Sequence, residues 1–196
     1  PSSKVDFFAW QELDSQPVIG VDEVGRGCLA GPVYAAAVIV NPQNDYSLYT
    51  DSKALSASRR EVLSEHIKTH HQWCIAFATV DEISRLNILW AAMLAMKRAV
   101  LGLNVQKGHV LVDGNQRIPD LSGYKQTTLI KGDLRAAPVA AASIIAKVAR
   151  DRWMQEQSKI FPQYAFDQHK GYSTKKHQEA IAKWGPCSLH RPTFAG

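Results

Sequence analysis

The chain has 196 residues, of which 45% are hydrophobic and 21% charged, so it can bury the core of one domain and is not a disordered chain. Its net charge is +5, and residues 101–196 hold 14 of the 23 basic side chains but only 7 of the 18 acidic ones, which favours a polyanionic partner. The longest apolar run, Val33–Val40, is too short for a membrane helix, and three scattered cysteines exclude a disulfide framework or a C-x-x-C zinc site.

The organisation of the chain is uniform. No internal repeat, low-complexity tract or flexible linker interrupts it, so we expect residues 1–196 to form a single domain. The first residues show no basic and apolar leader, and so few cysteines fit a reducing compartment. We therefore expect a cytoplasmic protein.

The predicted elements follow from periodicity and turn residues. Val18–Val24 and Val33–Val40 are rich in β-branched residues and flank a glycine-rich stretch, which predicts a hairpin. Ser58 and Glu61 have capping-box spacing, which predicts a helix that ends near His70. In chain order, the prediction is strands at 18–24 and 33–40, a loop at 51–53, a helix at 58–70, a strand at 73–80, a helix at 82–101, strands at 110–112 and 127–130, and helices at 138–159 and 173–184.

This order of elements predicts the architecture. Three early strands, followed by short strands that are linked through helices, favour an α/β fold. We expect a mixed β-sheet flanked by helices, with a helical C-terminal segment.

Four carboxylates stand out because they interrupt or end apolar strands. Asp22 and Glu23 lie inside the first predicted strand, where successive side chains point to opposite faces, so at least one of them faces a covered side of the sheet. Asp113 ends the fourth strand and Asp133 is placed at the end of the fifth, and such strand ends are where ligands bind in open α/β sheets. Each acid alone could cap a helix or pair with a basic residue, but the four together favour a metal site.

The chemistry of such a cluster is restricted. Carboxylates with no cysteine and little histidine near them select hard cations, Mg²⁺ or Mn²⁺, over Zn²⁺. Without a cation, their mutual repulsion would have to be relieved by protonation. An acidic cluster in basic surroundings is typical of two-metal phosphodiester chemistry, in which one ion activates water and the other stabilises the leaving 3′ oxygen. We therefore expect two ions during catalysis.

Eight motifs, in order along the chain, resemble those of the ribonuclease HII family. They are Gly20-Val-Asp-Glu-Val-Gly-Arg-Gly27, Leu29–Val33, Asp51-Ser52-Lys53 with Leu55-Ser56, Leu86–Leu89, Val112–Asn115, Lys131–Asp133, Ala140–Val148 with Arg150-Asp151, and His169–Tyr172. The resemblance extends from about residue 18 to Phe194.

The resemblance implies an RNase H-like fold and a metal-dependent endonuclease. Such an enzyme cuts the RNA strand of RNA–DNA hybrids and incises duplex DNA 5′ of embedded ribonucleotides, leaving 5′-phosphate and 3′-hydroxyl ends. The residues that match the family's catalytic metal site are Asp22, Glu23, Asp113 and Asp133. The backbone of Gly25-Arg26-Gly27 matches the motif that reads the ribose 2′-hydroxyl, and Tyr172 matches a tyrosine that stacks near the RNA-to-DNA junction.

These assignments have a physical basis. The 2′-hydroxyl distinguishes a ribonucleotide from its deoxy counterpart, and glycines let a backbone approach a sugar closely. Arg26 can also offer its charged fork to a phosphate, although a simple bulged turn between strands is the alternative for this motif. The remaining candidate substrate contacts are Lys53, Ser143, Lys147 and Lys170.

The chain departs from the family pattern at two positions. Cys28 stands where proline is common, and Ala54 stands where a second lysine is common, which removes one possible phosphate contact. With 17 residues before Val18, we expect no extra N-terminal domain of the kind that the related ribonuclease HIII carries, and we expect no clamp-binding tail after Phe194. We expect a monomer.

Two other functions remain open at this point. A nucleic-acid binding module without catalysis would need a basic face but no acidic cluster, because carboxylates repel phosphate. Another hydrolase with the RNase H-like fold would share the acids and differ in substrate, since a fold does not fix function.

Overall fold

The structure, a computed structural model, describes residues 6–194. Its strands are β1 (Val18–Val24), β2 (Val33–Ile39), β3 (Gln72–Ala78), β4 (Gly108–Asp113) and β5 (Tyr124–Leu129). Its α-helices are α1 (Ala57–His70), α2 (Val80–Leu86), α3 (Ile88–Gly102), α4 (Gly132–Arg135), α5 (Ala137–Ile160), α6 (Phe166–His169) and α7 (Lys175–Trp184). Short 3₁₀ turns are η1 (Trp10–Glu12), η2 (Ser52–Ala54) and η3 (Pro162–Tyr164).

The five strands form one mixed sheet in the order β3-β2-β1-β4-β5. β1 and β2 form the predicted antiparallel hairpin, and β3 extends it in the antiparallel sense. β4 lies parallel to β1, and β5 lies parallel to β4. The predicted α/β architecture with a mixed sheet is confirmed, and the carboxyl ends of β1 and β4 meet at the same edge.

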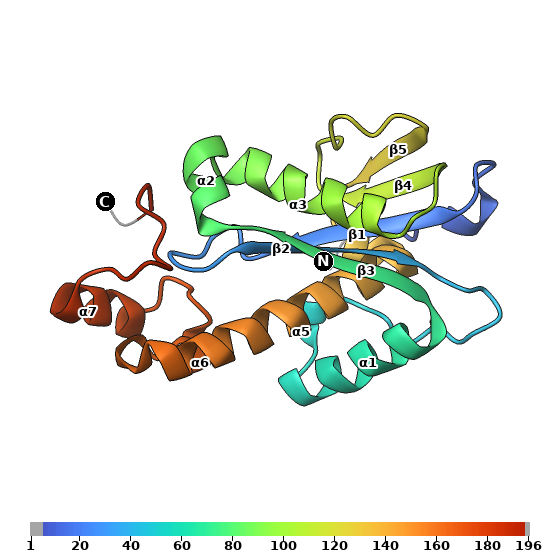
Figure 1. Ribbon diagram of the computed structural model, residues 1–196. Coiled ribbons are helices and arrows are strands. Elements are labelled where there is room, and N and C mark those ends of the chain that lie inside the picture. Colours follow the sequence, from blue (N-terminus) through green and yellow to red (C-terminus); the bar gives the residue numbers. More distant parts are fainter. Residues whose placement is uncertain (1–5, 195–196) are drawn as a thin grey trace.

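Helices cover both faces of the sheet, with α2 and α3 on one side and α1 and α5 on the other (Figure 1). The alternation of strand side chains supplies both cores. Val18 packs in the core with α5 and α1, whereas Ile19 and Val21 pack in the core with α3. The same alternation directs Asp22 and Glu23 to opposite faces of the sheet.

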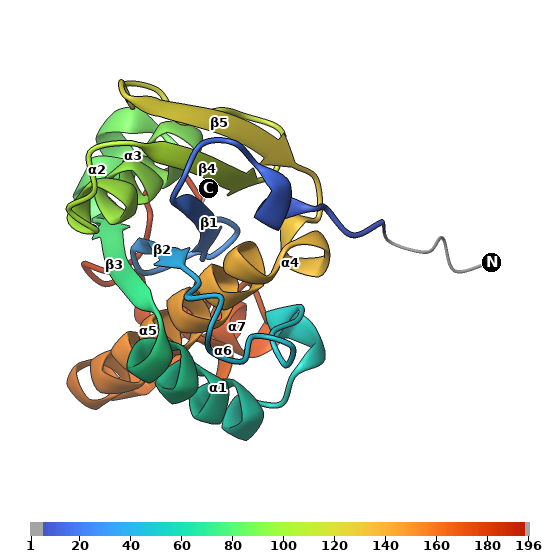
Figure 2. The same ribbon diagram turned by 90° about the vertical axis from the view of Figure 1, so that its right-hand side faces the viewer.

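Gly20 allows α5 to lie directly against β1. A Cβ at this position would collide with the backbone of Pro138 and Val139 in the first turn of α5. The following Ala140–Ala142 are also buried, so small side chains keep the long helix close to the centre of the sheet. Figure 2 shows α5 running beneath the strands, with α4 at its start.

Two predicted boundaries are wrong, each for a local reason. The side chain of Ser56, not Ser58, accepts the capping hydrogen bond of α1, from the amide of Arg59. β3 ends at Ala78 because Thr79 forms a capping box with Glu82 and starts α2.

The helix predicted over 82–101 is two helices. Asn87 separates α2 from α3, because its backbone has a φ of 72° and its side chain accepts a hydrogen bond from the amide of Trp90. The positive φ ends the helical conformation at Asn87, and asparagine caps the next helix well, so the apolar period continues across a break that periodicity alone does not show.

The predicted helical C-terminal segment is confirmed, and it includes η3 and the short helix α6, which the sequence did not indicate. Its buried residues Tyr164 and Phe166 pack with Met154 of α5 and Ala30 of the β1–β2 connection. This segment therefore covers one end of the sheet (Figure 1). Within residues 6–194, none of the helices combines the length and the apolar character that crossing a membrane requires.

Candidate active site

Two of the four acids meet because their strands are parallel neighbours. Val21 of β1 is paired with Val112 of β4, so Asp22 and Asp113, the next residue of each strand, lie side by side at the carboxyl ends. Asp22 is 5% exposed, and one of its carboxylate oxygens accepts a hydrogen bond from the amide of Glu23 at 2.8 Å. The expectation that at least one of Asp22 and Glu23 faces a covered side is confirmed.

Asp133 reaches the same place by a different route from the one predicted. β5 ends at Leu129, and Asp133 lies in the first turn of α4 rather than at a strand end. The amide of Gly132 donates to a carboxylate oxygen of Asp113 at 2.7 Å, which ties the start of α4 to the end of β4. The loop after β5 therefore turns back toward β4 and brings Asp133 to the cluster.

The electrostatics show that the four carboxylates influence one another. Burial raises the pKa of Asp22 well above its ordinary value, and the charges of Glu23, Asp113 and Asp133 raise it further. Burial also raises the pKa of Glu23, although Arg26 opposes the shift. The pKa of Asp133 rises to about 6 through burial and then through the charges of Asp113 and Asp51.

This donor set fits a hard divalent cation. All four groups are carboxylates from three elements, and the raised pKa values of Asp22, Glu23 and Asp133 include a repulsion that a cation would relieve. Within residues 6–194, no three His, Cys, Asp or Glu side chains already stand in the positions of a complete metal cage.

A further acidic side chain, which is not among the four predicted acids, lies beside Asp133. Asp51 precedes η2, caps it through the amide of Lys53 at 2.9 Å, and contributes to the raised pKa of Asp133. Lys53 opposes that shift, so its ammonium group also lies close to the acids. The sequence contained a signal for Asp51, since it belongs to the Asp51-Ser52-Lys53 motif, but only Lys53 was assigned a role.

Ser143 has a different environment from the other candidate contacts. It is 8% exposed, and its hydroxyl hydrogen-bonds the buried hydroxyl of Ser52 at 2.9 Å. This bond joins α5 to η2 and places the neighbouring Lys53 beside the acids. The geometry thus gives Ser143 a positioning contact within the chain.

A small cavity of about 220 Å³ opens on the α3 side of the acids. Its lining includes Glu23, Asp113 and Asn115, together with Arg26 and Met93. The Arg26 guanidinium lies 3.8 Å from the Glu23 carboxylate and is 47% exposed, so it faces both the acids and the solvent. This end of the sheet can therefore hold a charged group between carboxylates and one arginine.

The glycine-rich turn leads directly from the acids. Gly25 has a φ of 94°, and a Cβ there would collide with the guanidinium of Arg150, so both conformation and space require glycine. No atom lies within 4 Å of the position that a Cβ on Gly27 would take. The turn is thus closely packed on its inner side and open on its outer side.

Tyr172 lies on the far side of this turn. The ammonium of Lys147 lies 5.4 Å from the centroid of its ring, and Lys147 is also paired with Asp151 at 2.9 Å. Burial, followed by the nearby Cys28, raises the pKa of Tyr172 to about 12, so the phenol is neutral near pH 7. The side chain of Lys170 donates to the carbonyl of Asp167 in α6.

The predicted site residues thus form two adjacent groups. The four acids gather with Lys53 at the sheet edge, whereas Tyr172, Lys147 and Lys170 gather around the glycine-rich turn, which connects the two groups. Sequence reasoning missed Arg191, which is fully buried and bonded to that turn. Nothing in the local sequence distinguishes it from a surface arginine.

Comparison with known proteins places the chain among ribonucleases. The sequence model of the family described as Ribonuclease HII matches residues 19–196. Ribonuclease HII of Bordetella avium (strain 197N) is 51% identical over 194 residues, which cover 98% of this chain and 95% of the relative. Ribonuclease HII of Pelagibacter ubique (strain HTCC1062) is 50% identical over 176 residues, covering 90% and 94% of the two chains.

A solved structure has the same fold over most of its length. The structure of the PCNA:RNase HII complex from Archaeoglobus fulgidus superposes with a TM-score of 0.78 at 26% identity, covering 91% of this chain and 93% of that one. Its strands and helices thus follow the mixed sheet and flanking layers described above, which confirms the RNase H-like fold.

Proposed function

The chain belongs to the ribonuclease HII family, and from that premise we propose that it is a metal-dependent endonuclease that cuts the RNA strand of RNA–DNA hybrids and incises DNA 5′ of embedded ribonucleotides. Membership makes the enzyme a hydrolase of RNA in hybrids. The metal dependence and the incision at single ribonucleotides are the parts that we propose. The observation that supports them is the meeting of four carboxylates from three elements beside a turn in which Gly25 must be glycine.

The four acids have one shared role in this proposal. Asp22, Glu23, Asp113 and Asp133 would hold one or two divalent cations, Mg²⁺ or Mn²⁺, at the carboxyl ends of β1 and β4. When bound, such a cation supplies Lewis-acid stabilisation of phosphate oxygens and lowers the pKa of water. The chain itself contributes burial, which keeps bulk water away from Asp22, and like charges that make a cation necessary.

The turn and its neighbours would bind the substrate strand. The backbone of Gly25–Gly27 would contact the ribose 2′-hydroxyl, and the half-buried ring of Tyr172 would stack on a sugar or base next to the cut. Lys53, Lys147 and Lys170 would contact backbone phosphates, and Ser143 would hold Lys53 in place through Ser52. The products would carry 5′-phosphate and 3′-hydroxyl ends.

The setting in the cell is part of the same proposal. Cys28, Cys74 and Cys187 are all free thiols, which supports a reducing, cytoplasmic compartment. We propose that the chain acts there as a monomeric, single-domain enzyme.

Asp113→Asn tests the catalytic assignment. The change removes one negative charge and leaves the shape and the hydrogen bond from Gly132, so cleavage should be lost while binding of an RNA–DNA hybrid survives. Asp81→Asn is the matched control, because Asp81 is an exposed acid on α2 that pairs with Arg85. Undiminished turnover of the Asp113 variant would show that the four acids are not the catalytic site.

The substrate and metal tests separate this function from its alternatives. A DNA duplex with one ribonucleotide should be incised with Mg²⁺ or Mn²⁺ and not with EDTA, whereas an all-deoxy or 2′-O-methyl duplex should stay intact. Cleavage that persists in EDTA would contradict metal dependence, and binding without any incision would favour a non-catalytic module. Preferential cutting of a four-way DNA junction would instead identify another hydrolase of this fold.

A further inference from the structure

Two fully buried arginines hold the glycine-rich turn from behind. Arg150 belongs to α5, and Arg191 belongs to the segment that follows α7, yet both are 0% exposed and both reach the connection between β1 and β2. Neither guanidinium forms an ion pair with a carboxylate of the chain between residues 6 and 194.

Among residues 6–194, the hydrogen-bond partners of both guanidinium groups are backbone carbonyl oxygens. Arg191 donates to the carbonyls of Gly25 at 2.7 Å, Arg26 at 2.9 Å and Gly31 at 2.9 Å. Arg150 donates to the carbonyls of Ala30 at 2.8 Å, Pro32 at 2.9 Å and Lys170 at 2.6 Å. Five of these six carbonyls belong to residues 25–32.

Burying two arginines without charged partners is an unfavourable way to stabilise a fold. A buried cation without a charged partner loses its hydration, and burial lowers the pKa of Arg191 to about 10. Apolar side chains of similar volume fill a core at least as well as buried charges do. A planar fork with several fixed donors, however, is suited to holding several carbonyls in a set arrangement.

The geometry of the peptide bond determines what this does to the outer side of the turn. In a trans peptide, the carbonyl of one residue and the N–H of the next point in opposite directions, and the peptide bonds here are trans. Because the carbonyls of Gly25 and Arg26 face Arg191 inside the protein, the N–H groups of Arg26 and Gly27 face away from it. Within the described residues, neither N–H donates to another group of the chain.

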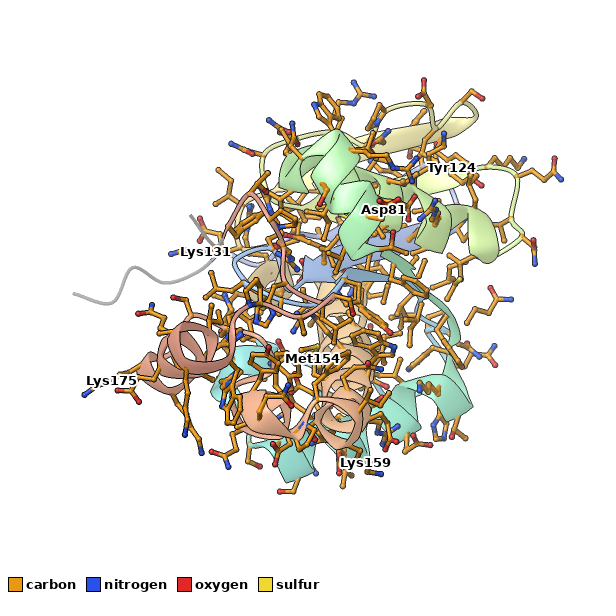
Figure 3. All side chains as sticks on the ribbon, turned by 60° about the vertical axis from the view of Figure 1, so that its left-hand side comes forward. Asp81, Tyr124, Lys131, Met154, Lys159 and Lys175 are labelled. Carbon is orange, nitrogen blue, oxygen red and sulfur yellow. The ribbon has the colours of Figure 1, made fainter. Side chains whose placement is uncertain are left out.

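Two adjacent, unused donors therefore face the open side of the turn. That side is unobstructed at Gly27, while Gly25 is packed against the side chain of Arg150; further along the β1–β2 connection, the sulfur of Met154 would lie 2.7 Å from a Cβ on Gly31. Met154 belongs to α5 and packs against Tyr164 and Phe166 of the C-terminal segment (Figure 3). The bonds from Arg191 hold the carbonyls of Gly25 and Arg26 on the inner side.

We propose that Arg191 is a positioning residue for ribose recognition: its guanidinium fixes the Gly25 and Arg26 carbonyls inward so that two adjacent amides are held outward toward a sugar hydroxyl. This inference rests on the proposed function. Arg150 adds to these contacts, because its bond to the Lys170 carbonyl joins the same turn to the loop that carries Tyr172. Discrimination of ribose from deoxyribose thus depends on a side chain more than 160 positions away in the sequence.

Arg191→Lys is the direct test. Lysine keeps the positive charge but cannot span three carbonyls, so the turn should lose its fixed orientation. In EDTA, where no cleavage occurs, the variant should bind an all-DNA duplex as the wild type does. Its preference for the same duplex with one ribonucleotide should fall about tenfold, as expected for one lost hydrogen bond, and kcat/KM for incision with Mg²⁺ should fall at least as much.

Arg98→Lys is the matched control for lost stability. Arg98 bonds the carbonyl of Phe77 and pairs with Glu82 at 2.6 Å on the α2–α3 side of the sheet, so this variant should be destabilised and yet keep the ribose preference. An Arg191→Lys protein that retains the wild-type preference and incision would overturn the proposal. A wild-type protein that does not incise the ribonucleotide duplex at all would refute the proposed function instead.

A measurement on the wild type covers the case in which the variant does not fold. The ¹⁵N–¹H signals of Arg26 and Gly27 should shift on addition of the ribonucleotide duplex and stay unchanged with the all-DNA duplex. Equal shifts with both duplexes would overturn the proposal, because the two amides would then not respond to the 2′-hydroxyl.

Discussion

His190 gives the chain a calculable sensitivity to acid. It is 4% exposed, it accepts a hydrogen bond from the amide of Cys187 at 2.9 Å, and its other ring nitrogen lies 2.9 Å from Nε2 of His177. A nitrogen that accepts from an amide carries no proton, so the ring is neutral in this arrangement. Burial, and then the neighbouring His177, lowers the pKa of His190 to about 4.

The size of the effect follows from this shift. In the unfolded chain the ring takes up a proton near pH 6.5, whereas in the folded chain it stays neutral until about pH 4, so the unfolded state binds more protons between these values. Stability is therefore lost as the pH falls through this window. From pH 7 to pH 5, His190 alone should lower the free energy of unfolding by about 2 kcal/mol.

The assay compares wild type with His190→Gln, since glutamine can keep both a donor and an acceptor at this position. Urea unfolding of both proteins at pH 7 and pH 5, in EDTA, isolates His190 from other titrating groups. Asp133 acts in the opposite direction, because its raised pKa of about 6 makes protonation stabilising as the pH falls. From pH 7 to pH 5, the free energy of unfolding of the variant should fall by about 2 kcal/mol less than that of the wild type. A difference between the proteins that does not change with pH would refute the neutral, buried state of His190.

Other predictions concern single contacts. Gly20→Ala should destabilise the fold by about 3 kcal/mol, measured by urea unfolding, because a Cβ would collide with the first turn of α5; a stable variant would contradict that packing. Glu82→Gln should cost about 1–2 kcal/mol at pH 7, since Arg98 holds the pKa of Glu82 at about 2, and the cost should vanish near pH 2. Cys28 is buried with a raised pKa, so it should react with iodoacetamide more slowly than Cys74 in the native protein; equal rates would contradict its burial.

Local patterns predicted the elements well where a single cause dominates. The strands β1 and β2 were predicted within one residue, because β-branched runs on either side of a glycine-rich stretch have few alternatives. The prediction of one helix over 82–101 from the apolar period is wrong at Asn87, because a single residue with positive φ can break a helix and leave the period unchanged. The short helices α4 and α6 carry no period at all, because each has four residues.

The candidate site shows the same division. Asp22, Glu23 and Asp113 could be selected from the sequence because an acid inside or at the end of an apolar strand is unusual. Asp133 was selected too, through the Lys131–Asp133 motif, but the Gly132–Asp113 hydrogen bond that ties the start of α4 to β4 is a tertiary contact. Asp51 likewise reaches the cluster only through the packing of η2 against α5.

The sequence by itself determined the residue types of the site, the strands that carry three of its acids and the family to which the chain belongs. It did so because these features are local, or recur as ordered motifs. Only the tertiary structure decided that Arg191 and Arg150 hold the carbonyls of the glycine-rich turn and so direct its amides outward. A hydrogen bond between residues more than 100 positions apart depends on how whole elements pack, and the residue types at its two ends do not reveal it.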